Sequence, residues 1–179
     1  MLRFFLIAAA LPILFCPPDG GVRFRFKGKE RVLTYPMRNE KSPFLPRGRH
    51  SNAELDTMSN CYFTDRNYVE IIRQDDPVRP KFGLAMGFEF DETNGEYPYT
   101  PAHAVLQLKD FGWGGVEFDP RDTCNYTGVS NAVSDDLDIE IDSFRNGMLY
   151  GRFSGLLLSG GDKMATLEEG QFAVRVYRK

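Results

Sequence analysis

The sequence predicts an all-β protein whose short strands pack as an antiparallel β-sandwich of jelly-roll or Ig-like meander type. Three observations carry this prediction. Apolar and polar residues alternate with a period of two in several short stretches, which is the pattern of half-buried strands. Clusters of Gly, Pro, Asn and Asp separate these stretches at close intervals. No stretch shows the 3.6-residue period of a long amphipathic helix.

The first half of the chain contributes five predicted strands. Residues 22–26 and 31–35 alternate on either side of Gly28, so they are expected to form a hairpin. The remaining three strands are predicted at residues 68–73, 82–90 and 104–109.

The last third of the chain predicts a meander of about four strands. Leu137, Ile139 and Ile141 alternate with acidic residues, which gives a strand with one apolar and one acidic face. Asn146-Gly147 is a strong signal for a two-residue turn, because both positions of a type I′ turn need positive φ. The chain is then expected to continue as strands at residues 148–159, 164–167 and 171–177.

The first sixteen residues predict an export signal. Arg3 precedes an apolar run over residues 4–15, which is too short to cross a bilayer and matches the apolar region of a secretory signal. Cys16 follows directly, as in bacterial lipoprotein signals, where that cysteine carries the lipid. Phe15 departs from this pattern, because a small residue is normal there, and cleavage by the general signal peptidase is the alternative. Residues 17–21 then form a short tether, and residues 22–179 a single domain.

The C-terminal meander resembles exported lipoproteins of Bacteroidota that have no established activity. They share a lipoprotein signal, a sandwich of short strands and a closing pattern of the form G-x-F-S-G-x-L followed by G-x-F-x-V. The matching residues here are Gly151, Phe153, Ser154, Gly155, Leu157, Gly170, Phe172 and Val174. The resemblance covers about a quarter of the chain and implies fold and location, not an activity.

The charge and the cysteine content indicate which partners and which cross-link to expect. The chain carries 22 Lys and Arg against 25 Asp and Glu, so it lacks the basic character typical of nucleic-acid-binding domains. Cys61 and Cys124 are expected to form a disulfide, because two cysteines in an exported domain usually pair. The alternative is that the two cysteines stay unpaired, with one or both buried as small apolar residues.

Two long loops, at residues 36–60 and 111–134, are expected to carry binding residues, and residues 51–58 within the first could form a helical turn. The candidate aromatic side chains are Trp113, Phe111, Tyr97 and Tyr99. They could stack on a sugar or anchor a protein partner, or they could simply pack these segments onto the core.

The acidic cluster is the candidate metal site. Calcium prefers six to eight oxygen ligands, and the nearest carboxylates in sequence are those of Asp135, Asp136, Asp138 and Glu140. Alternation along a strand favours a solvated acidic face instead, and the calcium-loop motif is absent. We expect no other cofactor.

No nucleophile elbow or phosphate loop occurs. The sequence therefore predicts a non-enzymatic, exported and lipid-anchored protein of the periplasm or cell surface. It would act as a binding or structural module with a protein or glycan ligand. The alternatives are a small envelope glycan hydrolase that uses paired carboxylates and a calcium-stabilised adhesin module.

Overall fold

The computed structural model describes residues 20–36, 60–63, 67–93, 95–110, 124–130, 136–159 and 163–178. Every regular element in these ranges is a strand, which confirms the all-β prediction. The strands are β1 (Gly21–Phe26), β2 (Lys29–Leu33), β3 (Asn60–Phe63), β4 (Tyr68–Gln74), β5 (Phe82–Glu89), β6 (Ala104–Asp110), β7 (Cys124–Ser130), β8 (Leu137–Arg145), β9 (Met148–Ser159), β10 (Lys163–Arg175) and β11 (Tyr177–Arg178). The described residues contain no helix long and apolar enough to cross a membrane.

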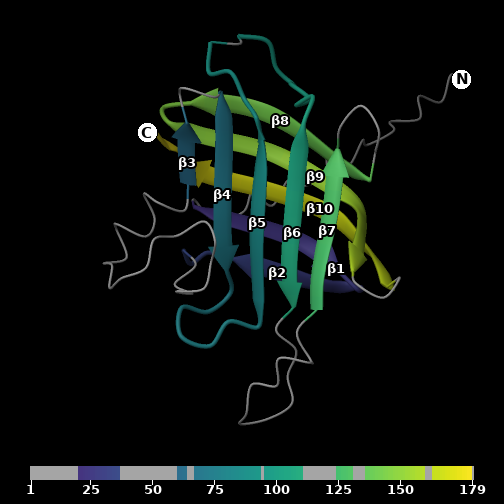
Figure 1. The fold of residues 1–179 in the computed structure, drawn as a ribbon. Coiled ribbons are helices and arrows are strands. Elements are labelled where there is room, and N and C mark those ends of the chain that lie inside the picture. The colour runs from purple at the N-terminus through teal and green to yellow at the C-terminus, as the bar shows by residue number, and fades with distance from the viewer. Residues whose placement is uncertain are drawn as a thin grey trace, which may run out of the picture.

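The strands form one sheet in the order β11-β3-β4-β5-β6-β7-β9-β10-β1-β2, with β8 paired to β9 beside this path. All described pairs are antiparallel except β11 with β3. Figure 1 shows β3 to β7 side by side in front, while β8, β9, β10, β1 and β2 run across them behind.

Strands that change partners join these two groups. The end of β9 pairs with β7, where Ser159 lies opposite Tyr126. After Val176, β10 is followed by β11, which pairs with β3. On the other side, Tyr35 beyond β2 exchanges two backbone hydrogen bonds with Gln74 of β4, at 3.1 and 2.8 Å. The sheet therefore curls into a nearly closed, barrel-like form, and the predicted sandwich of two separate sheets is not confirmed.

Side chains fill the interior of the curled sheet. The rings of Phe88 and Phe153 pack on Phe172, with centroids 5.9 and 6.3 Å apart. Phe26 makes edge-on contacts with Phe82 and with Tyr126. These rings belong to a single cluster of buried residues that draws on both groups of strands. Such aromatic contacts add to the hydrophobic stabilisation, and they lock the two groups together.

One charged residue lies inside this core. Arg73 is completely buried, and its Nε donates a 2.5 Å hydrogen bond to the carbonyl oxygen of Gly20. Its Nη1 donates to the carbonyl oxygen of Ile72 at 3.0 Å. Since a buried guanidinium is costly unless its N–H groups are satisfied, these bonds hold the start of β1 against β4.

Most of the predicted strands are confirmed. The hairpin of β1 and β2 turns at Lys27-Gly28 and that of β8 and β9 at Asn146-Gly147, with positive φ at all four turn residues. The predicted strands at 68–73, 82–90 and 104–109 match β4, β5 and β6. The expected strands 164–167 and 171–177 are largely one strand, β10, interrupted by a bulge.

Two described strands, β3 and β7, were not predicted. Most of β3 follows the first loop, and β7 lies within the second. The polar, glycine-containing sequence of β7 has a weak strand signal, yet it pairs with β6 over seven residues. Pairing with a neighbouring strand therefore overrode local propensity. The rest of both loops, including the predicted turn at 51–58, lies outside the described residues.

Gly151 gives a test of this packing. A Cβ atom there would lie 2.3 Å from the Phe172 ring and 2.6 Å from the carbonyl oxygen of Glu140. We expect Gly151→Ala to lower the free energy of unfolding by about 1–3 kcal/mol, because the backbone of β8 must move. Gly95→Ala, where a Cβ meets nothing within 4 Å, should leave it nearly unchanged. Urea denaturation measures both, and equal stability of the two variants would contradict the close packing.

Candidate functional site

A β-bulge hollows the outer face of the sheet. The pairing of β10 with β9 shifts between Leu167 and Gly170, and its pairing with β1 shifts between Arg23 and Arg25 of that strand. Glu169 sits at this point with a φ of 52°. An extra residue in one strand bends it and re-aims its side chains, so the surface here is not a regular pleat.

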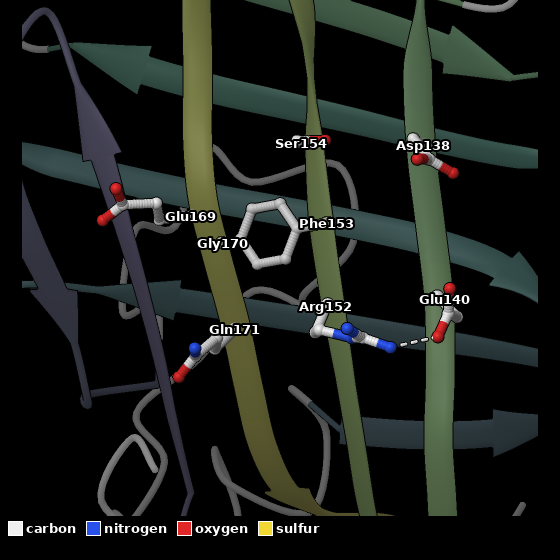
Figure 2. Close-up of a pocket in the computed structure, with 8 residues that line it drawn as sticks. All are labelled: Asp138, Glu140, Arg152, Phe153, Ser154, Glu169, Gly170 and Gln171. Atoms are coloured by element: carbon white, nitrogen blue, oxygen red, sulfur yellow. Dashed lines mark hydrogen bonds and ion pairs between the residues drawn. The ribbon is translucent and has the colours of Figure 1, made fainter. Parts of the chain in front are cut away.

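The hollow is a groove of about 330 Å³ over β8, β9 and β10. Its lining is mostly polar and charged and consists of Asp138, Glu140, Arg152, Phe153, Ser154, Glu169, Gly170 and Gln171. Figure 2 shows the polar side chains spread over three neighbouring strands, with the Phe153 ring between β9 and β10.

Gly170 keeps the floor of the groove open. A Cβ atom at this position would lie 2.4 Å from the carbonyl oxygen of Phe153 and 2.7 Å from its ring. The ring therefore packs directly against the β10 backbone beside the bulge. Only glycine allows this close approach.

Ion pairs organise the charged lining. Arg152 of β9 donates to the carboxylate of Glu140 through Nη2, and its Nε lies 3.0 Å from Oδ1 of Asp142. Partial burial raises the pKa of Asp142, although the nearby guanidinium of Arg152 acts in the opposite direction. On the opposite side of the groove, Nη1 of Arg25 lies 2.9 Å from Oε1 of Glu169.

Other polar side chains of the groove can form hydrogen bonds with a ligand. Asp138 lies opposite Ser154 in the register of β8 and β9, and within the described residues it has no ion pair. Its carboxylate is exposed to solvent and only accepts hydrogen bonds. The hydroxyl of Ser154 and the amide of Gln171 can donate as well as accept. The groove can therefore bind a ligand rich in hydrogen-bond donors, with Asp138 suited to a cationic group.

The groove contains part of the predicted acidic cluster. Asp138 and Glu140 line it, Asp136 is half-buried at the start of β8, and Asp135 lies outside the described residues. Within the described part of the chain, no three His, Cys, Asp or Glu side chains are grouped to hold a metal ion. Glu140 is instead bonded to Arg152.

Tyr97 and Tyr99 pack against the core as half-buried residues. Burial raises the pKa of both phenols, and nearby carboxylates add to the shift. The backbone of Tyr99 also bridges Ile141 of β8. Their burial therefore favours the alternative that Tyr97 and Tyr99 pack onto the core over the one in which they form an exposed binding surface. Trp113, Phe111 and Cys16 lie outside the described residues.

The expected disulfide between Cys61 and Cys124 is not seen. Cys61 lies in β3 and Cys124 in β7, and strands β4, β5 and β6 lie between these two. Four steps of about 4.8 Å separate the backbones by roughly 19 Å. A disulfide needs Cα atoms within about 7 Å, so this strand order does not support the bridge.

Arg152, Glu169 and Gln171 line the groove but were not predicted as site residues. Arg152 and Gln171 lie in predicted strands, where polar residues on the solvent side are ordinary, and Glu169 lies between two predicted strands. A bulge of one residue at Asp142 brings Glu140 opposite Arg152. No residue near Asp142 indicates in the sequence that a bulge occurs there. Counting back from the Asn146-Gly147 turn without that bulge would place Ile141 opposite Arg152.

A second, smaller hollow of about 140 Å³ lies on the outer face of β4, β5 and β6. It is lined by Tyr68, Glu70, Ile72, Ala85, Met86, Gly87, Val105 and Gln107. The Tyr68 ring lies over Gly87, where an added Cβ would be 2.2 Å from the phenol oxygen. This contact covers part of the hollow, which offers fewer polar groups than the first.

Comparison with protein-family models, curated proteins and solved structures gives no significant match.

The pKa of Asp142 gives a test of the ion-pair geometry. Because Arg152 lowers this pKa, Arg152→Gln should raise it further. A raised pKa means that the folded state binds the proton more tightly than the unfolded state. The contribution of Asp142 to the free energy of unfolding is therefore lost as pH rises from its ordinary pKa of 3.8 to its raised pKa in the folded protein. This loss should be larger in the Arg152→Gln variant.

Carboxyl ¹³C NMR titration measures the pKa of Asp142 directly. Arg25→Gln is the matched control, since Arg25 pairs with Glu169 instead. An unchanged pKa of Asp142 in Arg152→Gln would contradict the described pairing.

Proposed function

We propose that the protein is an exported, lipid-anchored, non-enzymatic binding module of the cell envelope, and that its ligand occupies the groove over β8, β9 and β10. The observation that carries this proposal is the groove at the β10 bulge, which combines the ion-paired Arg152 with the carboxylate of Asp138, for which the described residues provide no ion pair. The resemblance to exported lipoproteins of Bacteroidota agrees with it.

The filled interior favours binding on the outer face. Barrels that carry small ligands inside need a lumen, whereas the described interior here is occupied by phenylalanine and aliphatic side chains. Both described hollows lie on the outside of the sheet.

The groove chemistry favours a ligand with hydroxyl, amide and ammonium groups. Three carboxylates and one guanidinium line it, so its lining is net acidic. Muropeptides, the soluble fragments of peptidoglycan, carry all three groups and are present in a bacterial envelope. They are therefore the probe that we choose.

The first test is muropeptide binding to residues 17–179, the tether and the domain without the predicted signal, measured by isothermal titration calorimetry. Asp138→Asn should weaken binding up to about fivefold, the scale of an exposed ion pair. Glu168→Gln is the matched control, because Glu168 is exposed on β10 outside the groove lining. Absence of binding, or equal loss in both variants, would refute the groove as the site. Cleaved muropeptides would instead favour the glycan hydrolase.

Lipid anchoring is tested separately, in a bacterial host. The intact protein from the membrane fraction should have the mass of a chain that starts at a diacylglyceryl-modified Cys16. Cys16→Ser should move the protein from the membrane to the soluble fraction, because an acyl anchor supplies about 0.8 kcal/mol per buried methylene. Cys61→Ser is the control and should stay with the membrane. A full-length, unmodified chain would overturn the anchor.

A further inference from the structure

The chain is fastened to the barrel a few residues after Cys16, the predicted site of lipid attachment. The N–H of Gly20 donates a 2.7 Å hydrogen bond to the carbonyl oxygen of Ala173. The carbonyl oxygen of Gly20 accepts the 2.5 Å hydrogen bond from Nε of Arg73. Cys16 precedes Gly20 by four residues, and four residues of fully extended chain span at most about 14 Å. A lipid on Cys16 would therefore hold the Gly20 side of the barrel close to the membrane surface.

The connection from β4 to β5, residues 75–81, belongs to the same side of the barrel. It starts two residues after Arg73, whose side chain holds Gly20. Figure 1 shows this connection projecting beyond the ends of both strands. Val78 follows Arg73 by five residues, which is at most about 18 Å of chain. A lipid on Cys16 and the side chain of Val78 can therefore reach the same bilayer surface.

Carboxylate groups hold this connection in one conformation. Oδ1 of Asp76 accepts hydrogen bonds from the N–H groups of Val78 and Arg79, at 2.7 and 2.8 Å. Oδ1 of Asp75 accepts two further backbone N–H groups near the start of β5, at 2.8 and 3.0 Å. Such bonds fix a turn, because they satisfy backbone groups that have no partner strand. Val78 is therefore held outward, and it is 78% exposed.

Apolar and basic side chains share this surface. Val78 has the highest exposed fraction of the large hydrophobic residues in the described part of the chain. Tyr35 is 44% exposed, and its backbone is bonded to Gln74, the last residue of β4. Arg79 and Lys81 are also exposed. This combination suits the interface of a bilayer, where amphipathic rings, apolar side chains and basic residues contact the headgroups.

We propose that residues 75–81 and Tyr35 form a membrane-contact surface, with Val78 inserted among phospholipid headgroups when the chain is anchored at Cys16. This inference rests on the lipid anchor of the proposed function and not on the groove. Residues 75–81 contain two acidic and two basic side chains, so apolar contact and not net charge drives the insertion. Arg79 and Lys81 then lie at the level of the lipid phosphates.

The test supplies the anchor chemically, so it does not depend on processing in a host. Residues 16–179 carrying Cys61→Ser and Cys124→Ser are coupled through Cys16 to a maleimide phospholipid. The lipid is part of nanodiscs of phosphatidylethanolamine and phosphatidylglycerol. A gadolinium-chelating lipid in the same nanodiscs broadens the NMR signals of amides that lie close to the bilayer. The mass measurement on Cys16 reports natural anchoring separately, so failure of the anchor and failure of the membrane contact are distinguished.

The amide signal of Val78 should lose most of its intensity, while that of Met164 should keep it. Met164 is the control because it is also apolar and exposed, at 65%. It lies nine residues along β10 from Ala173, which is roughly 30 Å of strand from the bond that fastens Gly20. Equal broadening of both amides, or an unbroadened Val78, would overturn the proposal.

A matched pair of variants tests the side chain of Val78. Val78→Asp should reduce the broadening of the Arg79 amide about fivefold, because a charged group replaces the inserted apolar one. Met164→Asp, at the start of β10, should leave that broadening unchanged. Both positions are exposed, and far-UV circular dichroism confirms that both variants are folded. Equal broadening of Arg79 in Val78→Asp and in the protein without this change would contradict the insertion.

Discussion

The register of β8, β9 and β10 is the constraint on which the rest of this structure depends. Two bulges set it, one at Asp142 in β8 and one at Glu169 in β10. Because a shift of one residue exchanges the two faces of a strand, each bulge decides which side chains enter the core and which reach solvent. The same register places Gly151 under Phe172, where no larger residue fits.

The bulges also connect core packing to the outer groove. Phe153 packs inside against Phe24 and Phe172, yet its ring also forms part of the groove floor at Gly170. Arg152 and Ser154, its neighbours in β9, face outward into the groove. The floor is therefore as rigid as the core that supports it, which favours a preformed site over one that orders upon binding.

The described surface has a polar groove over β8, β9 and β10, and Asp138 of β8 is part of its lining.

The sequence by itself determined the strand class, the two tight turns and the inward-facing residues of β8, because these depend on alternation and on residues that accept positive φ. Only the tertiary structure decided the barrel-like closure, the strand β7 and the pairing of Glu140 with Arg152. Each of these depends on which strands meet and in which register. Such contacts join residues distant in the chain, and local periodicity carries no information about them. The wide separation of Cys61 from Cys124 has the same origin, since three strands lie between theirs.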